Sequence, residues 1–147
     1  MSAFDQKNSF RREQQAPAFD AAKLTESSYV GIAEKVIISH RDRKDRNAIS
    51  TSQIRILLDL LNGLREQLRT ERVKALTENM IGQVQYIKLR IVYAAGRDNE
   101  SKGVRDFIDS SGLIKCLDTV GDSVERYELV CKYMEALVAY HRYHINK

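Results

Sequence analysis

The sequence is poor in residues that break helices or build rigid scaffolds: its 147 residues include one proline, seven glycines and no tryptophan. With so few breakers, most of the chain can be helical. Cys116 and Cys131 lie apart and form no CxxC pair, which excludes a disulfide-rich secreted scaffold and gives no zinc signal. No uncharged apolar run approaches the ~18 residues of a membrane span, and residues 1–19 lack the apolar region of a signal peptide. We therefore expect a cytoplasmic protein with no membrane segment.

Signatures of common active sites are also missing. There is no GxGxxG, GxxxxGKS/T or GxSxG motif, so the sequence offers no dinucleotide loop, P-loop or hydrolase elbow. His141 and His144 stand one helical turn apart, but no third metal ligand is evident. Asp106 and Asp109 are expected to be solvated side chains rather than an acid–base pair. We predict a protein that is not an enzyme and needs no metal or cofactor.

The basic residues are concentrated in the middle of the chain, although the net charge is only +4. Residues 35–97 carry thirteen basic and six acidic side chains, a net of +7, whereas residues 1–34 carry a net of −1 and residues 98–147 a net of −2. A basic segment between weakly acidic ends is a candidate surface for a polyanion. A solvated face that happens to be rich in arginine remains the alternative on charge alone.

The hydrophobic pattern predicts an all-α protein, a compact bundle of about five helices over residues 23–147 after a flexible tail of residues 1–22. The β-branched run Val36–Ile38 keeps a strand as an alternative there. Ser50 and Gln53 form a capping box at a helix start. The last helix is apolar on two faces, which is typical of a helix at the centre of a bundle or one shared with a partner. The expected helices are 29–40, 50–68, 77–95, 104–120 with an interruption near Gly112, and 122–145.

Two groups of cations could bind phosphates. The first is a predicted loop of residues 41–47, which leads into the capped helix start, where backbone amides and the helix dipole favour an anion. Gln53 and Arg55 stand at that start and could hydrogen-bond a phosphate or a 2′-hydroxyl. The cations of the loop are Arg41, Arg43, Lys44 and Arg46.

The second group is a stripe on the helix of residues 77–95. Tyr86, Arg90, Tyr93 and Arg97 fall within about 60° of one another at 3.6 residues per turn. Aromatic rings and guanidinium groups on one stripe suit bases that stack and phosphates that pair. Two structural alternatives compete with this hypothesis: both tyrosines could lie in the core, and Arg90 could form an ion pair with Glu135.

Three stretches in order resemble one known family, the small subunit of the type III-A CRISPR–Cas effector, the Csm complex. Residues 49–55 (ISTSQIR) resemble the motif that opens a helix in that family, residues 85–97 (QYIKLRIVYAAGR) resemble its central helix, and residues 133–141 (YMEALVAYH) its closing helix. The resemblance covers about residues 28–145. Residues 41–47 and 98–125 match by length and character only.

The resemblance implies a non-catalytic helical-bundle subunit of an antiviral RNA-guided complex. Copies of such subunits form a filament beside the backbone subunits that hold the CRISPR RNA, and the filament also meets the large polymerase-like signature subunit. They line the groove that holds the guide RNA and its complementary target, and they bind the target RNA irrespective of its sequence. The residues that match the family's cations are Arg55, Lys88, Arg90 and Arg97.

Two other classes of function remain open. A small basic transcription regulator would need a recognition helix for duplex DNA, but Asp59 and Glu66 on the outer face of the capped helix would meet phosphates badly. A protein-only assembly adaptor would use its basic surface to bind an acidic partner. Binding to single-stranded RNA and to duplex DNA over a salt series separates the three.

Overall fold

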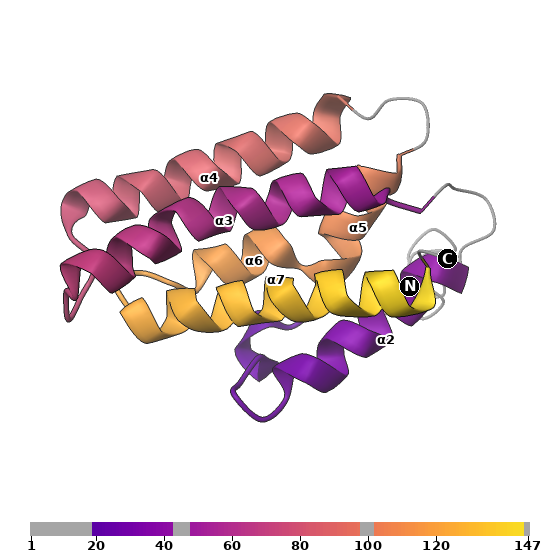
Figure 1. Cartoon of the computed structure of the whole chain (residues 1–147), viewed down its shortest axis with the longest axis horizontal. Helices are drawn as coiled ribbons and strands as arrows, with labels where there is room; N and C mark the ends of the chain where they lie inside the picture. Colours follow the sequence, from indigo (N-terminus) through magenta and orange to yellow (C-terminus); the bar gives the residue numbers. More distant parts are fainter. Residues whose placement is uncertain (1–18, 43–47, 98–101, 146–147) are drawn as a thin grey trace, which may run out of the picture.

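The structure is a computed structural model that describes residues 19–42, 48–97 and 102–145. Within these residues it is all-α, with six α-helices, one short 3-10 helix and no strand, as the sequence predicted (Figure 1). None of these helices is both long and apolar enough to cross a membrane. The elements are η1 (Ala21–Lys23), α2 (Tyr29–Asp42), α3 (Thr51–Glu71), α4 (Glu78–Arg97), α5 (Gly103–Ser111), α6 (Leu113–Asp118) and α7 (Val124–His144).

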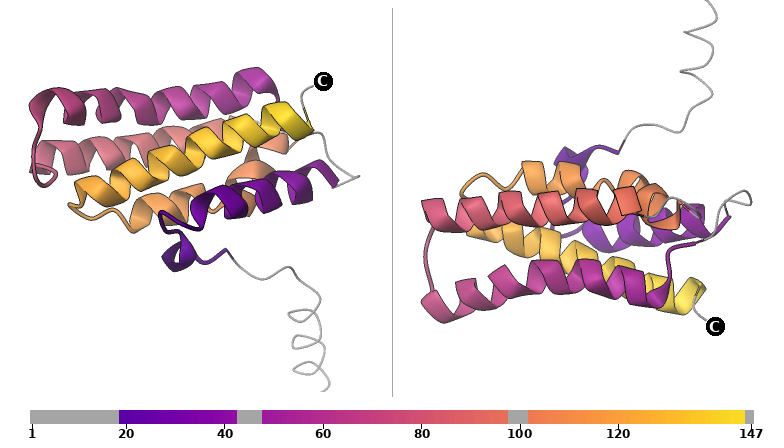
Figure 2. Two further views of the ribbon diagram at one scale, coloured as in Figure 1. Left: turned by 60° about the horizontal axis from the view of Figure 1, so that its bottom comes forward. Right: turned by 90° about the horizontal axis from the view of Figure 1, so that it is seen from above.

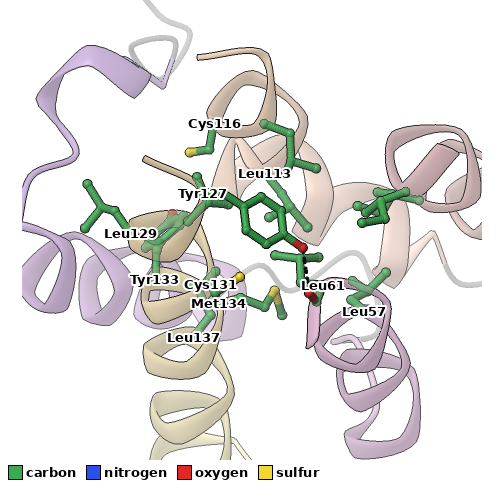
Figure 3. Packing of buried hydrophobic residues seen from close by; sticks show 14 of the residues in the cluster. Leu57, Leu61, Leu113, Cys116, Tyr127, Leu129, Cys131, Tyr133, Met134 and Leu137 are labelled. Atoms are coloured by element: carbon green, nitrogen blue, oxygen red, sulfur yellow. Dashed lines mark hydrogen bonds between the residues drawn. The ribbon is translucent and has the colours of Figure 1, made fainter. Parts of the chain in front are cut away.

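Helix α7 lies at the centre of the bundle, and α2, α3 and α6 pack around it (Figure 2). Its two apolar faces explain this position, and the prediction of a central last helix is confirmed. The Tyr127 hydroxyl donates to the Leu61 carbonyl of α3 at 2.5 Å (Figure 3), and the Tyr133 hydroxyl donates to the Ser111 carbonyl of α5 at 2.7 Å. Both tyrosines are fully buried, so each brings a satisfied polar group into the apolar core.

Local capping signals set the starts of the long helices. Ser50 accepts the Gln53 amide at 3.1 Å while the Gln53 side chain accepts the Ser50 amide at 2.9 Å, which is the predicted capping box of α3. Thr77 accepts the Met80 amide at 3.2 Å at the start of α4. Residues 29–42 are helical, so the strand alternative at Val36–Ile38 is excluded.

The predicted interruption near Gly112 separates α5 from α6. Gly112 has a φ of +62°, a left-handed conformation that costs glycine little. A Cβ at this position would also overlap the ring of Phe19, which stacks on Tyr133 with ring centroids 6.0 Å apart. Gly112 is therefore required both by the backbone turn and by the chain segment that crosses it.

That crossing segment extends the packed part of the chain toward the N-terminus. Ala21 and Leu24 are buried in the core, and Arg126 of α7 donates to both of their carbonyls at 2.6 Å. Phe19 and Ala21, which belong to the described part of the predicted tail, thus pack against the bundle. The remainder of the predicted tail, residues 1–18, lies outside the described residues.

Candidate nucleic-acid interface

An open pocket of about 320 Å³ lies between α3 and α4 and gathers three of the residues predicted to bind RNA. Gln53 reaches it from the start of α3, whereas Arg90 and Arg97 reach it from the last two turns of α4. Tyr93, between the two arginines on the predicted stripe, also lines it. The remaining lining residues are Ile56, Leu57, Leu60, Ala94 and Val104.

The two tyrosines of the α4 stripe lie on the surface. Tyr86 is 57% exposed and Tyr93 is 62% exposed, so the alternative that placed them in the core is wrong. The Arg90 guanidinium carbon lies 5.8 Å from the centre of the Tyr86 ring, and that of Arg97 lies 5.7 Å from the centre of the Tyr93 ring. Arg90 also donates to the Tyr86 hydroxyl at 3.3 Å. The stripe therefore presents two exposed aromatic–guanidinium pairs one after the other.

The alternative that paired Arg90 with Glu135 is wrong, because Glu135 pairs with Arg65 of α3. Arg65 is buried, and its guanidinium donates to Glu135 and, at 2.9 Å, to Glu128. Burial alone would lower the pKa of Arg65, but the hydrogen bonds with the two carboxylates raise it above its ordinary value. The feature of the sequence that could have indicated this pairing is the spacing of Glu128 and Glu135, which lie two turns apart on the same face of α7. The structure shows that this face meets α3.

The other two described candidates on α3 and α4 do not line the pocket. Arg55 is exposed on α3. Lys88 points from the opposite side of α4 and forms an ion pair with Asp118 of α6. The pairing of Lys88 places it on a different face from Arg90, because two residues apart on a helix differ by about 200°.

The predicted basic loop is only partly described. Arg41 belongs to the last turn of α2, not to a loop, and its Nε lies 2.9 Å from Asp42 Oδ1. Arg43, Lys44 and Arg46 lie outside the described residues. Because Arg41 precedes them and Ser50 follows them, both ends of this segment belong to the end of the bundle where α4 finishes (Figure 1).

A buried polar chain holds the start of α3 in place at this end. Asp106 Oδ2 lies 2.8 Å from His40 Nδ1, and His40 Nε2 accepts the Ile49 amide at 3.0 Å. The Ile49 carbonyl in turn lies 2.6 Å from His141 Nε2. Asp106 is only 2% exposed, so the expectation that it is solvated is wrong, whereas Asp109 is exposed. Three helices, α2, α5 and α7, thus fix Ile49, the residue that precedes the cap of α3.

The histidine side chains form hydrogen bonds within the bundle, and the two cysteine side chains are buried. His144 contacts Glu34 Oε2 at 3.0 Å while His141 contacts the Ile49 carbonyl, so the two do not converge as metal ligands. In the part of the chain that the structure describes, no three His, Cys, Asp or Glu side chains gather to hold a metal ion. Burial raises the pKa of both Cys116 and Cys131 to about 12, which keeps these thiols protonated at neutral pH.

Comparison with known proteins identifies the family. The profile of the Csm2 type III-A family matches residues 27–147. A "CRISPR system Cms protein Csm2" of Streptococcus thermophilus is 34% identical over 127 residues, which are 86% of this chain and 98% of the relative. The protein of that name from Mycobacterium tuberculosis (strain ATCC 25618 / H37Rv) is 33% identical over 120 residues, which are 82% of this chain and 94% of the relative. The chain belongs to the Csm2 family of type III-A CRISPR systems, as the resemblance of its three sequence stretches to the Csm small subunit predicted.

Proposed function

We propose that the protein is the non-catalytic small subunit of a type III-A CRISPR RNA-guided effector complex and acts in antiviral defence in the cytoplasm. Several copies form a filament along the backbone subunits that hold the CRISPR RNA, and the filament meets the large polymerase-like signature subunit. Each copy lines the groove of the guide and target RNA and binds the target RNA backbone without sequence specificity. Membership of the Csm2 family supports this assignment.

The observation that carries the RNA-binding part is the convergence of Arg90, Arg97 and Gln53 on one pocket beside the exposed ring of Tyr93. Guanidinium groups pair with phosphates irrespective of the base, and an exposed ring stacks on any base. The Gln53 carbonyl is occupied by the Ser50 amide, which leaves its side-chain nitrogen to donate to a phosphate or a 2′-hydroxyl. These side chains suit contacts with the phosphates and sugars of RNA, and they do not form the base-contacting surface of a recognition helix.

The remaining candidates extend this surface along the same end of the bundle. Arg55 lies two residues after Gln53 on α3, and Arg41 closes α2 just before the segment of Arg43, Lys44 and Arg46. We assign these cations to the RNA path, with Lys88 as a more distant contact that must leave Asp118 to reach RNA. With about two to four phosphate contacts per copy, one copy binds weakly, and repetition along a filament supplies the affinity.

The test is the affinity for single-stranded RNA of the variant Arg90→Ala/Arg97→Ala, with Lys74→Ala/Lys115→Ala as the matched control. The control removes the same charge from exposed positions away from the pocket. The pocket variant should bind RNA about ten- to a hundredfold more weakly at moderate salt, and its salt dependence should fall by about two charges. Equal affinities for the two double variants would refute the pocket as the RNA site.

The same titration examines the two other classes of function. Preferential binding to a duplex DNA would favour a transcription regulator. A log–log salt slope near zero with every nucleic acid would favour a protein-only adaptor. The exposed acidic residues Asp59 and Glu66 on the outer face of α3 disfavour the first of these classes.

A further inference from the structure

The buried polar chain at the start of α3 holds both backbone groups of Ile49. His40 of α2 accepts the Ile49 amide on its Nε2, and His141 of α7 contacts the Ile49 carbonyl through its own Nε2. Ile49 and both histidines are buried, so these bonds form away from solvent. The backbone just before the cap of α3 is therefore fixed from two other helices.

The two contacts also fix the protons of the imidazole rings. A backbone amide can only donate, so the neutral His40 ring carries its proton on Nδ1. Asp106 of α5 accepts from that Nδ1 at 2.8 Å, which holds the ring in the tautomer that the Ile49 amide requires. A carbonyl can only accept, so His141 donates from Nε2. The polar chain is thus a directed set of hydrogen bonds that ends on one residue.

Further hydrogen bonds lead from this residue to the pocket. Ser50 follows Ile49, and its amide donates to the Gln53 side-chain oxygen while its hydroxyl accepts the Gln53 amide. The Gln53 side chain is thus held by its oxygen, and its NH2 group is left to donate in the pocket that Arg90 and Arg97 also line. A shift of Ile49 would move Ser50 and Gln53 with it.

The other end of the polar chain belongs to a second wall of the same pocket. Val104 lines the pocket and stands two residues before Asp106 on α5. α5 in turn packs against α4, the helix that carries the two arginines. The bonds from Asp106 through His40 to Ile49 therefore set the start of α3 relative to the α4 and α5 side of the pocket.

Other contacts already anchor the length of α3. The Tyr127 hydroxyl donates to the Leu61 carbonyl, and Arg65 bonds Glu128 and Glu135. Placing a carboxylate and two imidazoles inside the bundle costs desolvation that apolar side chains would avoid. A fully satisfied polar network adds a single fixed geometry in return. The polar chain thus contributes to stability, but what it specifically defines is the position of the first turn of α3.

We propose that His40, Asp106 and His141 are positioning residues for RNA binding. None of the three lines the pocket. They act through Ile49 by setting where the Gln53 side chain stands relative to the two arginines. This role rests on the RNA site proposed above, and it assigns part of the RNA affinity to side chains that do not touch RNA.

Two substitutions of His40 separate its two hydrogen bonds. Glutamine places its terminal oxygen near the position of Nε2 and keeps an acceptor for the Ile49 amide, whereas the shorter asparagine reaches only the position of Nδ1 and keeps a donor for Asp106. His40→Asn should therefore weaken binding of an oligouridine RNA at low salt about three- to tenfold, the equivalent of one hydrogen bond. His40→Gln should recover most of this loss.

The matched control is Tyr127→Phe, measured like every variant well below its melting temperature. It removes one buried hydrogen bond between α7 and a later turn of α3, and it should bind the RNA as tightly as wild type. A loss of affinity in Tyr127→Phe equal to that in His40→Asn would mean that RNA binding merely follows stability, which would overturn the proposal. His141→Asn repeats the test from α7, because it removes the donor to the Ile49 carbonyl and leaves His40 in place.

A double-mutant cycle shows whether His40 acts through Gln53. In the Gln53→Ala background, His40→Asn should cost less than about twofold in RNA affinity, because the group that it positions is already gone. His141→Asn should show the same dependence on Gln53. Losses of equal size in both backgrounds would refute the positioning role.

Hydrogen exchange measures the positioning without RNA. The Ile49 and Gln53 amides should exchange about tenfold faster or more in His40→Asn than in wild type, because the first turn of α3 opens locally. Amides near Leu61 should change no more than they do in Tyr127→Phe. Unchanged protection of Ile49 in His40→Asn would show that the polar chain does not hold it.

The arginine variants separate this role from the proposed function. A loss of RNA affinity in Arg90→Ala/Arg97→Ala, with none in His40→Asn or His141→Asn, would remove the positioning role and leave the RNA site in place. An arginine double variant that binds RNA like its control would remove the RNA site, and the positioning role with it. Losses in both sets, with the histidine effect dependent on Gln53, support both.

Discussion

Glu135 of α7 pairs with Arg65 of α3, and the same buried guanidinium also bonds Glu128, two turns earlier on α7. These three side chains join the second half of α3 to the first half of α7, and none of them lines the pocket between α3 and α4. Arg90 does not pair with either carboxylate, and its guanidinium instead lies over the exposed Tyr86 ring. The partner of Glu135 thus decides that Arg65 is the buried, structural arginine and that Arg90 is left to line the pocket between α3 and α4.

Removing Arg65 should destabilise the bundle strongly. Arg65→Ala leaves the partly buried Glu128 and Glu135 close together without their cation, at a cost of about 3 kcal/mol in the free energy of unfolding. Glu135→Gln should cost under about 1 kcal/mol, because the Glu135 side chain is 49% exposed and Arg65 keeps Glu128. Urea unfolding followed by circular dichroism measures both. A larger loss in Glu135→Gln than in Arg65→Ala would contradict the arrangement.

Gly112→Ala should destabilise the protein far more than Gly121→Ala. Both glycines have a positive φ, so each alanine is strained by about 1 kcal/mol. Only at Gly112 would the added Cβ also overlap the Phe19 ring, which must then leave its place on Tyr133, and the total loss should reach about 3 kcal/mol. Thermal unfolding of the two variants gives the comparison, and equal losses would show that Phe19 does not pack there.

Asp106→Asn and Asp109→Asn should differ although the two residues stand one turn apart. Asp106 is buried against His40, so its neutralisation weakens the chain that holds Ile49 and should cost about 1–3 kcal/mol. Asp109 is exposed, and its substitution should change the stability by less than about 0.5 kcal/mol. Denaturant titration of both variants at one pH is the measurement. Two neutral substitutions would contradict the buried pair.

Stability should fall in alkaline solution. Burial raises the pKa of Cys116 and Cys131 from 9.0 to about 12, and burial also raises the pKa of Tyr127 and Tyr133. A raised pKa means that the folded state holds the proton more tightly, so this stability is fully present below pH 9 and is lost as the pH rises toward 12. Urea unfolding at pH 8, 10 and 11 should show a progressive loss.

Tyr127→Phe provides a control for that loss. The variant lacks the hydrogen bond to the Leu61 carbonyl and should be about 1 kcal/mol less stable at pH 8. With one fewer titrating group in the core, its stability should decline less between pH 8 and pH 11 than that of wild type. Parallel declines would mean that Tyr127 does not titrate with unfolding.

Much of the fold follows from local rules in the sequence. The 3.6-residue spacing of apolar side chains predicts the long helices, and the caps at Ser50 and Thr77 mark two of their starts. Gly112 predicts the break between α5 and α6 because it tolerates a left-handed turn. The grouping of Arg90, Tyr93 and Arg97 on one stripe of α4 was also predictable, since residues on one helix share a face whatever the helix packs against.

Only the tertiary structure decided which face met which neighbour. It assigned Glu135 to Arg65 rather than to Arg90, buried Asp106 but not Asp109, turned Lys88 toward α6, and placed Tyr86 in the open. Each of these outcomes depends on how the helices are placed against one another, and the Arg65 and Asp106 pairs join residues more than sixty positions apart. Periodicity within one helix places two side chains on the same face, but it does not say which distant residue that face meets. The sequence alone therefore determined the helices, the basic segment and the family resemblance, whereas packing determined which of its cations reach the surface that we assign to RNA.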